Sequence, residues 1–387
     1  MNSIGGLSDF AARLRRLIRG PAHRMPPRAG TPPGAECEAR SEPWRPCLPD
    51  AAFNSLALEL FGLQFEHNAP YRRLCQARNM SPEDAAGWSR IPAAPTAAFK
   101  ELELSCLPPE ERTAVFYSSG TTGQERSRHF HNGRSLALYR ASLIPWFKAN
   151  VMDSGCGIED WQLAILTPAP EQAPHSSLVH MFETVRRSLG SPGSAFLGKA
   201  AADGAWSLDL EAATAALQSS VRSAKPLLLL GAAFMFVHLL DHLAKQCLEL
   251  ELPPGSRAME TGGYKGRSRA MPANELRALI TRRLGIPPAR IIREYGMCEL
   301  SSQAYAPAGA SRAFRFPAWA RVQVISPETG IEAAEGETGL IRVFDLANVY
   351  SVLAVQTEDL AVNRADGFEL LGRAVLAEPR GCSLMAQ

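Results

Sequence analysis

The stretch with the clearest chemical character is a run of six small residues that follows the apolar run Ala114–Tyr117. Glycines let backbone N–H groups close around an anion, and hydroxyls rotate to fit phosphate oxygens, so the run predicts a phosphate-binding turn. No lysine closes it as in a Gly-Lys-Ser/Thr loop, and a solvated surface loop is the alternative interpretation. The run consists of Ser118, Ser119, Gly120, Thr121, Thr122 and Gly123.

A second glycine-rich segment, Met259–Gly266, lies further along the chain. Its paired glycines, Gly262 and Gly263, permit close approach of the backbone to a substrate. Lys265 in the same segment either reaches an anionic substrate or phosphate, or is an ordinary surface lysine.

These residues need a scaffold, and the hydrophobic pattern predicts one. Asp50 is the predicted N-cap of one helix, and residues 81–84 predict the start of a second helix. The prolines in Ile91–Thr96 predict an extended segment. Helices alternating with strands indicate an α/β fold. Apolar runs predict strands at 114–117, 161–166, 226–230, 290–293, 321–325 and 340–344, and helical spacing occurs at 53–63, 131–148, 178–189 and 234–243.

Composition narrows the classes of function. The chain has 387 residues, 41 basic and 39 acidic, and a formal net charge of +2, which argues against a general nucleic-acid-binding protein. Its 8 cysteines form no Cys-x-x-Cys pair, which favours reduced thiols and a cytoplasmic location. The longest apolar run, Leu227–Val237, is too short to cross a bilayer, and no signal peptide is predicted.

The N-terminal part differs from the rest in composition. Apolar residues at helical spacing alternate with arginines over residues 7–20, which suits a short helix or a segment that touches a membrane surface or an acidic partner. Residues 21–49 are rich in proline, glycine and charge. We therefore expect residues 1–49 to be a disordered or linker extension, and the folded domain to begin at residue 50.

Three short motifs add specificity to the first glycine-rich turn. They read Arg-Glu-Tyr-Gly-Met-Cys-Glu-Leu over residues 293–300, Gln-Thr-Glu-Asp-Leu over 356–360, and Leu-Gly-Arg-Ala over 371–374. In order and spacing the four motifs resemble the signature set of adenylate-forming enzymes, which activate a carboxylate with ATP. The resemblance implies a large α/β domain over residues 50–373, with mixed sheets layered against helices.

Within that superfamily the sequence is most similar to the acyl-protein synthetases of the bacterial bioluminescence fatty-acid reductase system, and more distantly to phenylacetate–CoA ligases. Three further stretches carry this likeness, at Ile91–Lys100, Leu229–Asp241 and Arg380–Leu384. It implies ATP and Mg²⁺ as cofactors. The expected substrate is a carboxylic acid of the fatty-acid class, and the expected acyl acceptor is a protein such as an acyl reductase.

The resemblance also implies a role for each matching residue. The turn Ser118–Gly123 would hold the β- and γ-phosphates, Glu299 the metal ion, and Asp359 the ribose hydroxyls. Cys298 replaces the family's usual threonine, and a thiol is a weaker donor to phosphate. The remaining assignments are Tyr295 and Gly296 at the adenine, Arg373 at the ribose or phosphate, and His175, Ser176, Gly262 and Gly263 in the substrate pocket.

The sequence departs from the superfamily pattern at its C-terminal end. It ends 14 residues after Arg373, so we expect the mobile lid domain and its catalytic lysine to be absent. Lys265, Arg126, Arg128 or a partner protein would have to compensate. The tail, residues 374–387, carries Cys382, which in acyl-protein synthetases accepts the acyl group from acyl-AMP.

Three functional hypotheses follow from these residues. The first is a long-chain-fatty-acid–protein ligase that forms acyl-AMP and then an acyl thioester on Cys382. The second is a carboxylate–CoA ligase for an aryl or medium-chain acid, which would not need Cys382. The third is a non-catalytic nucleotide-binding subunit, which the missing lysine and Cys298 would suit.

Overall fold

Helices and strands alternate along most of the chain, as the α/β prediction requires. The computed structural model describes residues 5–20, 48–118, 125–152, 161–263, 268–306 and 313–374. The helices are α1 (Gly5–Arg19), α2 (Asp50–His67), α3 (Ala69–Ala77), α4 (Ala98–Glu101), α5 (Gly133–Val151), α6 (Ser177–Leu189), α7 (Leu210–Ser223), α8 (Ala233–Lys245) and α9 (Ala273–Leu284).

The strands form two larger sheets and two hairpins. The first seven are β1 (Ala94–Pro95), β2 (Ala114–Tyr117), β3 (Arg128–His131), β4 (Gln162–Ile165), β5 (Ala195–Phe196), β6 (Gly198–Ala200) and β7 (Trp206–Leu208). The others are β8 (Leu227–Ala232), β9 (Arg257–Thr261), β10 (Ile291–Tyr295), β11 (Ala304–Ala306), β12 (Ala320–Ile325), β13 (Thr338–Asp345), β14 (Ala354–Arg364) and β15 (Gly367–Arg373).

The central sheet has the strand order β11-β10-β9-β8-β4-β5. Its pairs from β10 to β5 are parallel, and β11 joins β10 in the antiparallel sense. Both faces are covered, because Leu228 and Leu230 enter one apolar cluster while Leu227 and Leu229 enter another. This explains why β8 is apolar at successive positions rather than at alternate ones.

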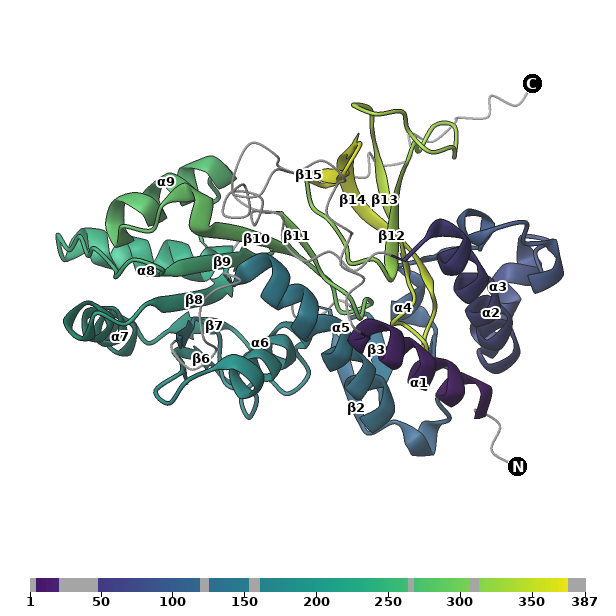
Figure 1. Cartoon of the computed structure of the whole chain (residues 1–387), viewed down its shortest axis with the longest axis horizontal. Helices are drawn as coiled ribbons and strands as arrows, with labels where there is room; N and C mark the ends of the chain where they lie inside the picture. Colours follow the sequence, from purple (N-terminus) through teal and green to yellow (C-terminus); the bar gives the residue numbers. More distant parts are fainter. Residues whose placement is uncertain are drawn as a thin grey trace, which may run out of the picture.

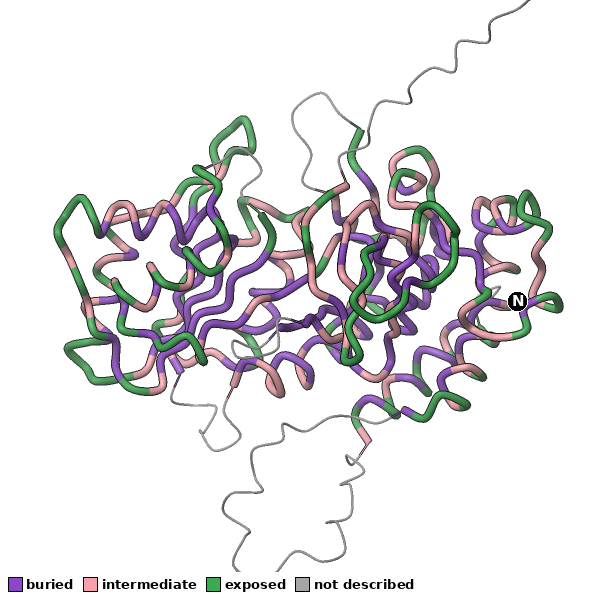
Figure 2. Tube along the Cα trace, turned by 90° about the horizontal axis from the view of Figure 1, so that it is seen from above, coloured by how far each residue is buried: buried purple, intermediate pink, exposed green. Residues whose placement is uncertain are grey.

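Helices from different parts of the chain cover the two faces. One cluster joins Leu229 and Ile291 of the sheet to Leu239 of α8 and Leu276 of α9. The opposite cluster joins the sheet to α5 and α6, for example through Phe182. Figure 1 shows this layered arrangement, and Figure 2 shows the strands as a buried interior with exposed residues mainly in connections and outer helix faces.

A second sheet, β1-β14-β13-β12 with β15 paired to β14, lies beside the β10–β11 end of the central sheet (Figure 1). Its long strands β13 and β14 pair in the antiparallel sense, with a register shift between Leu340 and Arg342. Strand β14 then pairs with β15 so that Asp359 lies opposite Arg373. This sheet therefore carries the third and fourth sequence motifs on neighbouring strands.

The N-terminal residues differ from the expectation of a disordered or linker segment. Gly5–Arg19 forms helix α1, and its side chains Leu7, Phe10 and Leu14 are at most 1% exposed. Apolar burial against the rest of the core therefore fixes residues 5–19, whereas residues 21–47 lie outside the described part. Asp50 is the first residue of α2, and Pro49 rather than Asp50 occupies the N-cap position.

No helix in the described part of the chain has the length and apolar character that a membrane span needs.

Buried polar contacts join the two sheets at the end of β13. The carboxylate of Asp345, which is fully buried, accepts hydrogen bonds from the backbone N–H groups of Ser301 (2.9 Å) and Ser302 (2.7 Å), and from the Ser302 hydroxyl (2.7 Å). Nearby, Asn348 donates from Nδ2 to the backbone oxygen of Glu299 (2.8 Å). The segment that follows β10 is thus held in place by the second sheet.

Replacement of Asp345 with asparagine should destabilise this junction. The amide NH₂ would face N–H and O–H donors, which leaves buried donors unpaired at about 1–3 kcal/mol in the free energy of unfolding. Urea titration measures the change. Asp241→Asn is the matched control, since Asp241 and Arg269 form an exposed ion pair at 3.0 Å, worth roughly 0–1 kcal/mol. Equal midpoints for the two variants would contradict this role of Asp345.

Candidate functional site

The hairpin β2–β3 brings together the two ends of the Ser/Thr/Gly turn. Ser118 N–H donates to the Ser127 backbone oxygen (3.1 Å), and Ser127 N–H donates to Ser118 Oγ (2.9 Å). Ser118 therefore closes the base of the turn, and its hydroxyl proton stays available for donation. The other residues of this turn, Ser119, Gly120, Thr121, Thr122 and Gly123, lie outside the described residues.

A buried histidine connects this hairpin to the Tyr-Gly motif. His129, opposite Phe116 in the hairpin, lies with Nδ1 2.7 Å from the backbone oxygen of Cys298. A carbonyl oxygen only accepts, so Nδ1 must carry the proton and donate. Burial lowers the pKa of His129 to about 4, so the ring is neutral near pH 7. The strand that leaves the turn is therefore fastened to the residue that precedes Glu299.

The carboxyl ends of β9 and β10 place two glycine-containing segments at one edge of the sheet. These strands are parallel, with Glu294 opposite Thr261. Gly262 follows β9 with φ +65°, a backbone conformation that favours glycine, and Gly263 is exposed beside it. Ligands of parallel α/β sheets commonly bind outside this edge. Lys265 lies outside the described residues.

Gly296 lies close to the end of the Glu294 side chain, which a larger residue would displace. A Cβ at this position would lie 2.4 Å from Glu294 Oε1, a distance that real Cβ atoms do not adopt. The glycine therefore lets the chain turn closely around a buried carboxylate just before Cys298 and Glu299.

Tyr295, Asp359 and Arg373 come together from both sheets. Tyr295 O–H donates to Asp359 Oδ2 (2.8 Å), and Arg373 Nε lies 3.8 Å from Asp359 Oδ1. The Arg373 side chain is 76% exposed, so its ion pair contributes little stability by itself. A carboxylate has two acceptor oxygens, so Asp359 has the chemistry to accept hydrogen bonds from a pair of ligand hydroxyls.

The Tyr295 ring is buried among aromatic side chains. Its centroid lies 5.2 Å from that of Phe368, 6.0 Å from Phe314 and 6.3 Å from Phe316, all with edge-on geometry. Such packing fixes the direction of the tyrosine hydroxyl. The phenol thus acts here as a rigid donor that orients Asp359.

Glu299 lies between the two sheets and is 3% exposed. The described residues contain no cluster of three or more side chains of the types that ligate metals. One carboxylate still suits Mg²⁺, because this ion commonly takes one or two protein carboxylates and completes its shell with substrate phosphates and water. Glu299 is therefore the described residue that would hold Mg²⁺ if phosphates arrive with the ion.

His175 and Ser176 lie against the strand that leads into the Ser/Thr/Gly turn. Tyr117 N–H donates to the His175 backbone oxygen (2.9 Å), and the two rings meet edge to face at 5.0 Å. Ser176 caps α6 by accepting from Val179 N–H (3.3 Å). The structure thus gives both residues a local packing role beside the turn.

A buried carboxylate lies directly under the Tyr-Gly motif. Glu294 accepts a hydrogen bond from Thr261 Oγ1 and is 6% exposed. Burial raises the pKa of Glu294 to about 7, the bond from Thr261 opposes the rise, and the charge of Glu260 adds to it. Glu260 itself pairs with Arg293 at 3.0 Å. Burial therefore favours the protonated form of the Glu294 carboxyl group relative to an exposed glutamate.

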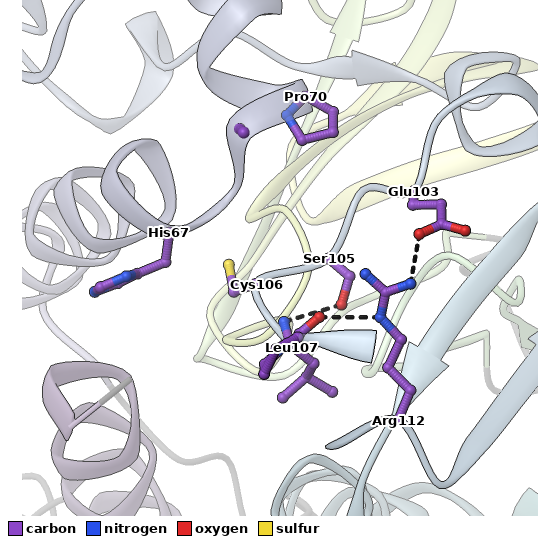
Figure 3. A pocket seen from close by; sticks show the side chains of 9 residues that line it. His67, Pro70, Glu103, Ser105, Cys106, Leu107 and Arg112 are labelled. Atoms are coloured by element: carbon purple, nitrogen blue, oxygen red, sulfur yellow. Dashed lines mark hydrogen bonds and ion pairs between the residues drawn. The ribbon is translucent and has the colours of Figure 1, made fainter. Parts of the chain in front are cut away.

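A cavity of about 360 Å³ lies elsewhere, between the α2–α3 junction and the segment 103–112 (Figure 3). Arg112 closes one side by bonding Glu103 (2.5 Å) and the Leu107 backbone oxygen (3.0 Å). Cys106 lines it, but burial raises the pKa of this thiol, which disfavours a nucleophilic thiolate. None of the residues proposed from sequence line this cavity, so it is separate from the candidate site.

Sequence reasoning missed three residues that shape the site: His129, Asp345 and Asn348. For the last two a signal was present, since a carboxylate and an amide directly follow an apolar strand in Phe344–Asn348. For His129 the alternation in Arg128–His131 indicates a strand, but nothing local points to Cys298.

Comparison with known proteins identifies the family. The family model described as acyl-protein synthetase, LuxE, matches residues 49–387. The chain belongs to the acyl-protein synthetase family. No curated protein matches the sequence. Membership supports an enzyme that activates a carboxylic acid with ATP to form acyl-AMP.

Solved structures show the same fold in an adenylate-forming ligase. The open conformation of 2-hydroxyisobutyryl-CoA ligase with 2-HIB-AMP and CoA aligns with TM-score 0.63 at 14% identity, covering 89% of this chain and 74% of that one. The same ligase in the postadenylation state with 2-HIB-AMP gives 0.62 at 16% identity, with 89% and 72% covered. The predicted adenylate-forming α/β fold of this acyl-protein synthetase family member is confirmed.

The carboxyl group of Glu294 should make stability pH-dependent. An ordinary glutamate has a pKa of roughly 4.3, so between that pH and about 7 the unfolded chain has lost a proton that the folded chain keeps. The free energy of unfolding therefore falls as pH rises through this window, by up to about 1.4 kcal/mol per pH unit.

Unfolding titrations of the wild type and Glu294→Gln across this window measure the effect. The variant should lack this fall in stability, so its stability relative to the wild type should rise with pH. Glu66→Gln, at a side chain that is 70% exposed, controls for loss of a carboxylate. If the Glu294→Gln curve runs parallel to that of the wild type, Glu294 does not hold this proton.

Asp359→Asn should weaken ATP binding. The amide loses the negative charge and turns an NH₂ group toward the Tyr295 hydroxyl or the ligand, where an acceptor is needed. Loss of a charged acceptor predicts about 10- to 100-fold weaker binding. Calorimetric titration with ATP and Mg²⁺ measures it, with Glu358→Gln as the neighbouring control in β14. Unchanged affinity in Asp359→Asn would exclude the residue from the nucleotide site.

Proposed function

We propose that this protein converts a fatty acid to acyl-AMP with ATP and passes the acyl group through Cys382 to a partner protein such as an acyl reductase. The observation that carries the proposal is the meeting of the motifs. His129 joins the turn's hairpin to Cys298, and Tyr295 bonds Asp359 from the other sheet. Family membership supports the same chemistry.

In the adenylation step the substrate carboxylate attacks the α-phosphorus of ATP and pyrophosphate leaves. The turn Ser118–Gly123 binds the departing phosphates through backbone N–H and hydroxyl donors, because negative charge builds on these phosphates. Asp359 takes the ribose hydroxyls and so fixes the nucleotide. Mg²⁺, when bound at Glu299, supplies charge neutralisation on the phosphate oxygens.

In the transfer step the Cys382 thiolate attacks the acyl carbonyl, a carbon–sulfur bond forms, and AMP leaves with the electron pair of the mixed anhydride. Arg380 beside it in the sequence favours the thiolate. A nucleophile of the partner protein, such as an acyl reductase, then attacks the thioester carbonyl, takes the acyl group and releases the Cys382 thiolate. Both residues lie outside the described part of the chain, and the assignment rests on the family.

A cation must offset the charge that develops on the reacting phosphate. Arg128 is already engaged, because its guanidinium donates to the Lys100 backbone oxygen (3.2 Å) and lies 3.8 Å from Glu103. This favours Lys265 or Arg126 over Arg128 for the role.

Cys382→Ser should separate the two steps. The variant should retain acid-dependent pyrophosphate release but form no acyl thioester, because a serine hydroxyl is a far weaker nucleophile than a thiolate at neutral pH. Intact-protein mass spectrometry after incubation with ATP, Mg²⁺ and a fatty acid detects the covalent acyl group.

Cys247→Ser is the matched control, since Cys247 is the exposed free cysteine of the described residues and should keep full labelling when replaced. Equal labelling of wild type and Cys382→Ser would remove Cys382 from the mechanism. Release of free acyl-CoA by Cys382→Ser at the wild-type rate would instead establish the carboxylate–CoA ligase.

A further inference from the structure

A cavity of about 550 Å³ lies where the C-terminal end of α1 meets α5, outside the candidate catalytic site. Its volume is in the range of small-molecule sites. Four of its lining residues are cations, and no acidic residue lines it. The four are Arg15, Arg19, Arg140 and Lys148.

These cations lack partners within the described part of the chain. None of the four takes part in an ion pair there, in contrast to Arg13 of α1, which pairs with Glu59 of α2. In addition, Arg15 Nε has almost no accessible surface and no hydrogen-bond partner among the described residues. A buried donor without an acceptor is costly, and an anion bound at this point would supply the acceptor.

Cations are favourable near the C-terminal end of a helix, but this explains only part of the positive charge around the cavity. Arg19 is in the last turn of α1, where a cation is favourable. Lys148 is likewise in the last turn of α5, whereas Arg140 is exposed in the middle of that helix. Burial first, and then the charges of Arg140 and Arg187, lower the pKa of the neighbouring His180 to about 4. The charge of Glu183 opposes this lowering. Arg15 and Arg140 are the lining cations that helix position leaves unexplained.

The other part of the lining is apolar. Ile18, Ile144 and Pro145 contribute it, and Pro145 interrupts the backbone hydrogen bonding of α5 at this point. A membrane surface cannot use the apolar face of α1, because Phe10 and Leu14 are buried against the core. The cavity is thus suited to a discrete group with a charged part and an apolar part.

We propose that this cavity binds a phosphate ester, with the phosphate between Arg15, Arg140 and Lys148 and the apolar part against Ile144 and Pro145. Guanidinium groups match phosphate oxygens in a two-point geometry, and a dianion offsets more of the clustered positive charge than a carboxylate does. The ester is either a free metabolite or a lipid headgroup. This site does not depend on the proposed adenylation.

Calorimetric titration with glycerol 3-phosphate tests the site in the full chain, at low ionic strength, with the nucleotide site saturated by Mg²⁺ and a non-hydrolysable ATP analogue. The wild type should bind the probe. The double variant Arg140→Gln/Lys148→Gln should bind at least about tenfold more weakly, since two charge-assisted contacts are lost. Arg222→Gln/Lys225→Gln, with the same charge change at exposed positions, should bind as the wild type does.

Sedimentation with vesicles separates the two sources. Binding to phosphatidylglycerol vesicles but not phosphatidylcholine vesicles, lost in Arg140→Gln/Lys148→Gln, identifies a lipid headgroup. Binding of glycerol 3-phosphate without vesicle binding identifies a free phosphate ester. The proposal is overturned if the wild type binds neither probe, or if both double variants lose binding equally.

Discussion

The position of the candidate site depends on one buried carboxylate between two sheets. Asp345, at the end of β13, accepts bonds from the backbone of Ser301 and Ser302, which belong to the segment after β10. Because an unpaired charge in this position would be costly, each bond constrains the relative placement of the sheets. Glu299, two residues before Ser301, is held to the same junction by Asn348.

Strand pairing fixes the positions of the remaining motifs relative to the junction at Asp345. Tyr295 ends β10 at the central sheet, while Asp359 lies in β14 of the other sheet, and their hydrogen bond spans the two. Arg373 lies opposite Asp359 because β14 and β15 form a hairpin. On the other side His129 fixes the hairpin that bears the Ser/Thr/Gly turn. The geometry of the site therefore depends on how the two sheets are placed relative to each other.

Apolar periodicity predicted the strands whose faces are both buried, such as β8 and β10, and the covering helices α5, α6 and α8, but not α7 and α9. It missed β9, since Arg257, Glu260 and Thr261 make this strand polar in sequence although the structure buries it. Their charges are accommodated by tertiary contacts, for example Glu260 with Arg293, which no local pattern reveals. Strand β14 was missed for the same reason, because Gln356, Glu358 and Asp359 make this strand polar in sequence.

The order of the motifs predicted that Tyr295, Asp359 and Arg373 lie together, but not which contacts hold the segments that carry them. The contact between His129 and Cys298 joins residues 169 positions apart, and the role of Asp345 depends on packing of two sheets. The N-terminal helix was expected to be part of a linker because its neighbours in sequence are polar and proline-rich. Its buried face, with Phe10, shows that a short amphipathic segment docks when a complementary apolar surface exists elsewhere in the chain.

The central claim is that this assembly activates an acid as its adenylate. Exchange of labelled pyrophosphate into ATP, measured with purified protein, Mg²⁺ and a series of fatty acids, tests it most directly. The account predicts exchange that requires the acid. Absence of exchange with every acid, in folded protein that binds ATP, would contradict it and leave a protein that only binds nucleotide.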